Sequence, residues 1–221
     1  MSPALRRLFV VATVVTLAVT LLRLVGELAR WSPALFNRAA GGPGALVGIV
    51  WLIPVFGVLF ALRLAKEGQP PPSLAKAFGW AVLAFVVNTA LAIGSFKLFP
   101  TSPIAQLAIF GVGSWIAIAL ARLGWPALWR VLLLYDLAAR VPVVVIMFLA
   151  IFLGWDSHYA KPRPDFPPMG RWGLFAWTAL LPQMSLWIYL TVVGGILFGA
   201  IAVGVRRLAG RRDRAPLTSA A

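Results

Sequence analysis

The sequence contains no cysteine, one histidine and only six acidic residues among 221. The absence of cysteine excludes disulfides, thiolate metal ligands and thiol catalysis. A single histidine excludes a bis-histidine haem or a multi-histidine metal site built by one copy of the chain. Only 12% of the residues are charged, about half the fraction of an average soluble domain. The chain therefore lacks the polar surface that a soluble protein of this length needs to cover its core.

Hydrophobic residues make up 61% of the chain and form six long apolar stretches. These are Leu8–Ala29, Gly44–Ala65, Leu74–Phe96, Pro103–Arg122, Ala127–Leu153 and Leu174–Val205. Each is long enough to cross a bilayer as a helix, which takes about 20 residues. None alternates polar and apolar residues as a spanning β-strand would. We therefore predict an all-α, polytopic bundle of six transmembrane helices, a single membrane domain over residues 1–221 with no soluble domain.

Two stretches need an additional interpretation. The last is too long for one straight span, and we expect Pro182 to divide it, because proline interrupts a helix. The first could instead be a signal peptide, with Arg6 and Arg7 before its apolar core. No small-x-small cleavage site follows, and the helical pattern continues through Arg23 to Glu27. We therefore expect an uncleaved span.

The basic residues predict the orientation. With six spans, both termini lie on one side, which carries twelve Lys and Arg residues: Arg6, Arg7, Arg63, Lys66, Lys76, Arg122, Arg130, Arg206, Arg207, Arg211, Arg212 and Arg214. The other side carries six: Arg30, Arg38, Lys97, Lys161, Arg163 and Arg171. Cytoplasmic loops are the more basic ones, so we place both termini, including a basic tail over 206–221, in the cytoplasm of a plasma-membrane protein.

The net charge of +14 has the same explanation. The cations lie at the ends of apolar runs, where anionic lipid headgroups account for them. We therefore expect membrane lipids as partners and no nucleic acid.

The first apolar stretch carries a polar stripe. Its members are three or four residues apart and so share one helical face: Thr13, Thr16, Thr20, Arg23, Glu27 and Arg30. Arg23 and Glu27 are one turn apart and can form an ion pair. Anchoring of the stripe at the outer interface is favoured over a functional site, because only Arg23 is deep enough to need a special explanation.

A second polar group lies in the fifth stretch. Arg140 falls near its middle, Asp136 is one turn earlier, and Tyr135 could donate a hydrogen bond nearby. A charge at the bilayer centre costs at least ~2.5–3.5 kcal/mol, so this pair either fixes helix packing or serves a proton relay or an anionic-substrate site. Asn88 of the third stretch, a packing residue by default, could line a cavity with Arg140.

The connection after the fifth stretch holds Asp156, His158 and Tyr159. Ser157, His158 and Asp156 could be drawn as a catalytic triad, but adjacent residues seldom meet that geometry. We expect a histidine held by loop hydrogen bonds and assign no catalytic and no metal-ligating residue. In the last stretch, Gly195 and Gly199 form a GxxxG motif, which predicts close helix packing within the chain or, alternatively, a homo-oligomer seam.

Two functions from different classes remain open. The first is a non-enzymatic protein that binds or transports a small or lipid-like molecule, or a subunit of a membrane complex. The second is a membrane-embedded enzyme for a lipid or isoprenoid substrate at the outer face, where His158, Asp156, Arg23 and Glu27 would converge. No cofactor motif is present, so the sequence leaves the cofactor unknown. The two functions differ in where these side chains gather.

Overall fold

The computed structural model describes residues 1–42 and 44–212, and over these residues the chain is helical without strands. The helices are α1 (Pro3–Leu28), α2 (Leu52–Lys66), α3 (Leu74–Leu98), α4 (Pro103–Ala121), α5 (Pro126–Leu153), α6 (Arg171–Leu174), the π-helical η1 (Phe175–Leu180), α7 (Leu181–Met184) and α8 (Leu186–Arg212). The part of the predicted tail over 213–221, with Arg214, lies outside the described residues.

Five helical stretches are long and apolar enough to cross a membrane: α1, α3, α4, α5 and the stretch Arg171–Gly210. Together with the shorter α2, these stretches make up the bundle. The predicted all-helical membrane bundle is thereby confirmed.

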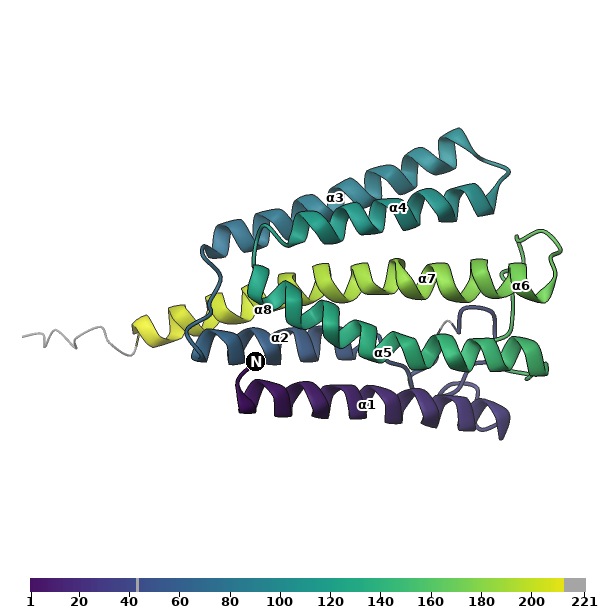
Figure 1. Cartoon of the computed structure of the whole chain (residues 1–221), viewed down its shortest axis with the longest axis horizontal. Helices are drawn as coiled ribbons and strands as arrows, with labels where there is room; N and C mark the ends of the chain where they lie inside the picture. The colour runs from purple at the N-terminus through teal and green to yellow at the C-terminus, as the bar shows by residue number, and fades with distance from the viewer. Residues whose placement is uncertain (43, 213–221) are drawn as a thin grey trace, which may run out of the picture.

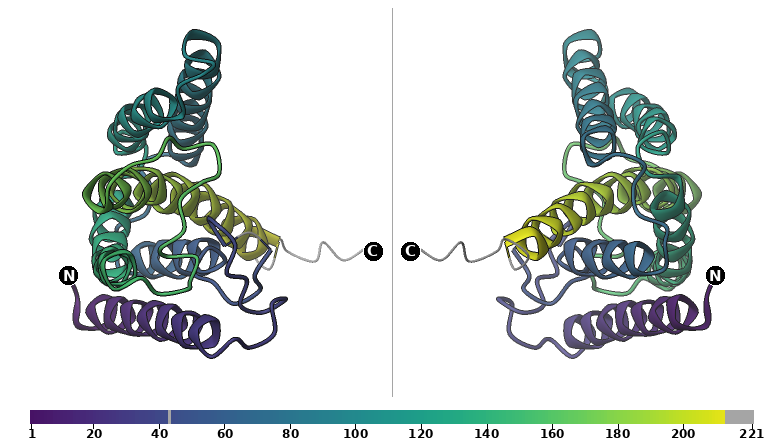
Figure 2. Two further views of the ribbon diagram at one scale, coloured as in Figure 1. Left: turned by 90° about the vertical axis from the view of Figure 1, so that its right-hand side faces the viewer. Right: turned by 90° about the vertical axis from the view of Figure 1, so that its left-hand side faces the viewer.

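The helices form layers (Figure 1). The α3–α4 hairpin makes one layer, and α8 packs against both of its helices as well as against α2 and α5. α1 lies at the opposite edge, on α5 and α2 (Figure 2). The N-terminus and the end of α8 lie toward one end of the bundle, and the connections before α2 and after α5 lie toward the other (Figure 1). The bundle therefore has one end with the termini and one end with the two long connections.

Serine caps and prolines set several helix starts. The Ser2, Ser73 and Ser102 side chains accept from backbone N–H groups three residues on, as N-caps do. Pro3 and Pro103 occupy the first helical position after two of these caps, where a missing N–H costs nothing. α1 consequently begins at Pro3, before the apolar run that identified it.

The second predicted span is wrong in its first third. Residues 44–51 are not helical, and α2 begins only at Leu52. Pro54 explains the late start, because proline is tolerated in the first helical turn and disrupts a helix interior. α2 is therefore about 22 Å long, shorter than the ~30 Å hydrocarbon core of a bilayer.

The last predicted span is divided, as expected, but not at Pro182 itself. The turns before this proline widen into η1, and helical geometry is interrupted at Ser185, whose φ and ψ are −132° and −72°. α8 then begins at Leu186. Proline removes a backbone donor and displaces the preceding turn, which accounts for a disturbance spread over several residues.

Close packing of α2 on α8 depends on glycine. A Cβ atom at Gly57 would lie 2.7 Å from the Gly195 Cα atom, and one at Gly199 would lie 2.7 Å from the Ala61 Cβ atom. Both glycines of the GxxxG motif thus permit helix contact within the chain. The motif is occupied by α2 and needs no second copy to explain it.

Candidate functional site

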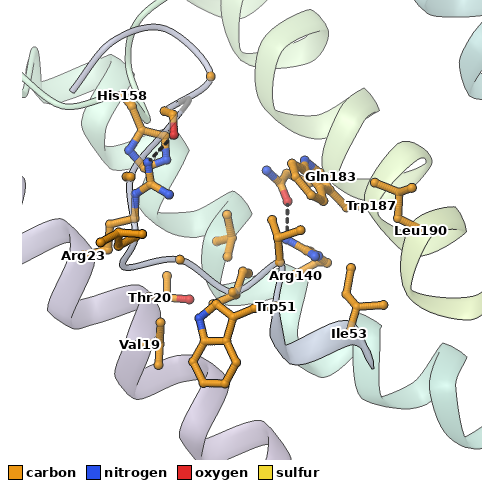
Figure 3. Close-up of a pocket in the computed structure, with 18 of the residues that line it drawn as sticks. Val19, Thr20, Arg23, Trp51, Ile53, Arg140, His158, Gln183, Trp187 and Leu190 are labelled. Carbon is orange, nitrogen blue, oxygen red and sulfur yellow. Dashed lines mark hydrogen bonds between the residues drawn. The ribbon is translucent and has the colours of Figure 1, made fainter. Parts of the chain in front are cut away.

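A cavity of about 960 Å³ lies between α1, α2, α5, α7 and α8, and residues of the two long connections also line it (Figure 3). Its lining combines apolar side chains such as Ile53 and Leu190 with the tryptophans Trp51 and Trp187. Arg23 of α1 and Arg140 of α5 both face it. One cavity therefore joins the two charged groups that interrupt the apolar spans.

One wall of this cavity is not helical. Residues 44–51, which precede α2, contribute Leu46, Gly48 and Val50 to the lining. Within a bilayer, irregular backbone is tolerated where it is covered by protein or lines a cavity, because lipid cannot satisfy its polar groups. Here Leu46 N–H donates to the Ala34 carbonyl at 3.2 Å. Because α2 begins only at Leu52, the non-helical residues before it are free to form this wall of the cavity.

The first charged cluster is built around Glu27, which is fully buried. Its carboxylate accepts from Arg23 Nε at 2.9 Å, from the His158 backbone N–H at 2.8 Å and from His158 Nδ1 at 2.5 Å. A carboxylate only accepts, so His158 carries its ring proton on Nδ1. Glu27 therefore fastens the connection after α5 to α1, and the predicted Arg23–Glu27 ion pair is confirmed.

Arg23 also holds the connection before α2. Its Nη2 donates to the Gly42 carbonyl at 3.0 Å and to the Asn37 carbonyl at 3.5 Å. Gly42 has a φ of +58°, and a Cβ atom there would lie 1.9 Å from Arg23 Nη2. Only glycine combines this backbone conformation with such an approach. Hydrogen bonds to Glu27, Gly42 and Asn37 thus hold Arg23 in place at the edge of the cavity.

The rings of His158 and Tyr159, in the connection after α5, are in tilted contact. Their ring centroids are 3.8 Å apart, and the Tyr159 hydroxyl donates to the Thr20 carbonyl at 3.5 Å. Burial lowers the pKa of His158, and the hydrogen bond to Glu27 opposes this shift without reversing it. Burial likewise raises the pKa of Tyr159. At neutral pH both side chains are therefore uncharged, and they border the cavity as polar aromatic groups.

Asp156 does not join this cluster. It is exposed and pairs with Arg38 and with Lys161, the latter at 2.8 Å. These cations lower the pKa of the Asp156 carboxyl, with Lys161 the larger cause. The Ser157 hydroxyl is buried without a hydrogen-bond partner. Ser157, His158 and Asp156 therefore do not form a catalytic triad, which agrees with the expectation from the sequence.

The second charged cluster lies deeper. Arg140 is near the middle of α5, about 20 Å from either end given the helical rise, and its side chain is only 4% exposed. Its Nε donates to Asp136 at 3.3 Å and its Nη1 to Gln183 at 3.5 Å. The guanidinium lies 4.8 Å from the centre of the Trp187 ring. The predicted Asp136–Arg140 pair is therefore confirmed, and Thr191 also donates to Asp136.

Three other predicted residues lie away from the cavity. The Tyr135 hydroxyl bonds to Thr16 at 2.7 Å and joins α5 to α1. Asn88 of α3 donates to Ser114 of α4 at 3.4 Å. Asp136 lies behind Arg140 and does not line the cavity. The cavity thus presents guanidinium groups, with their carboxylates behind them.

The structure places two residues at the cavity that the sequence did not single out as site residues. Gln183 and Trp187 line the cavity beside Arg140, although the sequence suggests ordinary packing for both. Gln183 directly follows Pro182, and Trp187 lies four residues after Gln183. This closeness to the proline was the available signal, because a broken helix often borders a site. Among the described residues, no group of three His, Cys, Asp or Glu side chains could hold a metal ion.

Comparison of the chain with protein-family models, with curated proteins and with solved structures finds no match. Two positively charged groups in a mostly apolar cavity can bind a molecule with a hydrophobic body and polar, electron-rich atoms. A neutral histidine oriented by a glutamate could also accept a proton.

Proposed function

We propose that the chain binds a small lipid-like molecule within the membrane, and that the cavity between α1, α5 and α8 is the binding site. The observation that supports this proposal is the meeting of Arg23 and Arg140 in one otherwise apolar cavity. The cavity volume of about 960 Å³ suits a ligand of drug size or larger. Its tryptophans Trp51 and Trp187 offer flat apolar surface with a polar edge.

The depth of the cavity favours a membrane-derived ligand. Arg23 lies within about 8 Å of the end of α1 given the helical rise, whereas Arg140 lies near the middle of α5. The lining of the cavity therefore includes residues near the end with the two long connections and residues near the middle of α5. Binding is the first part of the proposal, and transport across the membrane would additionally require an opening toward the other end.

A cavity-filling substitution tests this proposal. Gly194 lines the cavity, and a Cβ atom there would meet Ile53 at an ordinary 3.4 Å, so Gly194→Leu should fill space without breaking the helix contact. Gly204→Leu is the matched control on α8, since its Cβ atom would have only Leu74 within 4 Å, at 3.8 Å. Native mass spectrometry of protein taken from its own membrane should detect a bound small molecule in the wild type and the control. It should be lost from Gly194→Leu, and a wild type that carries none would contradict the proposal.

The same measurement addresses the partners and the assembly. We propose membrane lipids as partners, and the masses of intact complexes would reveal a homo-oligomer or a larger membrane complex. The plasma membrane with both termini cytoplasmic stays our proposed location and orientation. A tag on each terminus that is accessible only from the cytoplasmic side would support it.

The second candidate function is an enzyme that acts on a lipid or isoprenoid at the same cavity. The contact between His158 Nδ1 and Glu27 favours it, because a glutamate-oriented neutral histidine is a suitable general base. Glu27, however, is already used by Arg23 and by the His158 backbone, which suits a fastening role. Turnover of a co-purified ligand that is lost in His158→Gln, with ligand binding retained, would favour the enzyme.

A further inference from the structure

The two arginines of the cavity differ in how completely their donors are used. Arg23 makes a 2.9 Å hydrogen bond to Glu27 and a 3.0 Å hydrogen bond to the Gly42 carbonyl. Arg140 makes two long ones, at 3.3 Å to Asp136 and 3.5 Å to Gln183. A guanidinium carries five N–H donors in a fixed plane, and a buried one is costly unless they are satisfied. Arg140 is therefore the less completely satisfied of the two arginines.

The carboxylate behind Arg140 is also incompletely used. Asp136 is 1% exposed, and its Oδ2 atom is buried without a hydrogen-bond partner. Its Oδ1 atom accepts from Thr191 as well as from Arg140 Nε. Asp136 thus offsets the charge of Arg140 through one oxygen at a long distance, and it does not hold the guanidinium in a two-point contact.

Arg140 also has a fixed position. The Trp187 ring lies 4.8 Å from its guanidinium centre, and arginine stacks on aromatic faces in this way. The Gln183 side chain contacts it from α7. A charged group that is nine-tenths buried, oriented by its neighbours and exposed to a cavity loses little entropy when it binds an oxyanion.

We infer that the ligand of this cavity is an amphiphile with a carboxylate or phosphate group, and that Arg140 binds that group. This inference rests on the proposed function and specifies its chemistry. The oxyanion accepts two N–H groups of Arg140, the arrangement that a guanidinium favours. The hydrophobic tail lies along Ile53, Leu190 and Phe198. Arg23 holds the connection before α2 in place and borders the site.

Asp136 has a defined role in this arrangement. It compensates the charge of Arg140 while the cavity is empty, and it competes with the ligand for the same guanidinium. Removing the Asp136 charge should therefore strengthen the binding of an anion and lower the stability of the protein without ligand. A pair that only fixes helix packing would show the second effect without the first.

The experiment compares oleate, oleyl phosphate, methyl oleate and acetate as probes of the full-length protein in detergent. Binding is followed by the shift of the unfolding temperature with probe concentration. The wild type should bind oleate or oleyl phosphate more tightly than methyl oleate, by about 10- to 150-fold, the range of a hydrogen bond to a charged group. Acetate, which has the charge without the tail, should bind much more weakly than oleate.

Three variants make the result specific. Arg140→Gln should remove the preference for the charged probes, and Asp136→Asn should strengthen their binding. Because Arg140→Gln leaves the Asp136 charge unpaired, the double variant Asp136→Asn with Arg140→Gln serves as its neutral, similarly shaped counterpart. It should fold and should bind oleate and methyl oleate alike.

The possible failures are distinguishable. If no probe with a hydrophobic tail binds, the proposed function fails together with this inference. If oleate, oleyl phosphate and methyl oleate bind equally to the wild type and to the double variant, the cavity binds lipids and only the role of Arg140 is overturned. Acetate binding as tight as oleate would overturn the amphiphile and indicate a free anion instead.

Discussion

Replacing Glu27 by Gln would remove the charge from the contact that fastens the connection after α5 to α1. The wild-type carboxylate is fully buried and accepts three hydrogen bonds, from Arg23 at 2.9 Å and from two nitrogens of His158 at 2.8 and 2.5 Å. An amide keeps one acceptor oxygen and points two donors toward these donors. Arg23 would then lose its counter-charge while remaining only 12% exposed.

The size of the effect follows from these contacts. Breaking a buried ion pair by removing one partner costs about 3–5 kcal/mol, because the remaining charge is left uncompensated. Using the lower value, we expect the unfolding temperature to fall by about 6–12 °C for a chain of this length. Tyr159, 5% exposed in the wild type, should become accessible as the connection detaches.

Glu67→Gln is the matched control. Glu67 also accepts from an arginine four residues away, Arg63 at 2.6 Å, but that arginine side chain is 35% exposed. Ion pairs of this kind contribute little. Thermal unfolding in detergent and chymotrypsin cleavage after Tyr159 provide the two measurements. Equal unfolding temperatures and equal protection of Tyr159 in the two variants would refute the role assigned to Glu27.

Two further predictions concern packing and pH. Gly57→Ala should destabilise the protein by about 1–3 kcal/mol relative to Gly79→Ala. A Cβ atom at Gly57 would lie 2.7 Å from the Gly195 backbone, whereas one at Gly79 would have no atom within 4 Å. Similar denaturation curves for the two variants would contradict this prediction. The lowered pKa of His158 means that the unfolded chain takes up a proton first as the pH falls below about 6.5, so the wild type should lose stability there. His158→Gln should flatten this pH dependence, and an unchanged slope between pH 7 and 5 would count against a neutral buried imidazole.

The spans were largely predictable, because hydropathy reports directly on what a bilayer accepts. The start of α2 was the exception. Gly44–Trp51 is apolar enough to extend the span, and hydropathy does not distinguish a helix from an irregular segment that lines a cavity. Pro54 carried part of the missing information, since proline is favoured in the first turn of a helix and destabilises a helix interior.

The site was predictable only in its local parts. The pairs Arg23–Glu27 and Asp136–Arg140 follow from a spacing of four residues on a helix. The contact between Glu27 and His158 joins residues 131 positions apart, which no periodicity encodes. Proximity in sequence was also misleading for Asp156, which neighbours His158 along the chain but pairs with Arg38 and Lys161.

The non-helical wall over residues 44–51 has a consequence for which ligands the proposed site would accept. A helical wall moves as a rod, because each residue is bonded to another four positions away, so reshaping it displaces a whole span. The irregular segment bonds instead to a neighbouring connection, from Leu46 to Ala34 and from Val47 to Leu35. In the proposed binding site, we therefore expect this segment to adapt to tails of different length while the spans stay in place. A site with a fixed charge at Arg140 and an adjustable wall opposite should select its ligands by headgroup and tolerate variation in their chains.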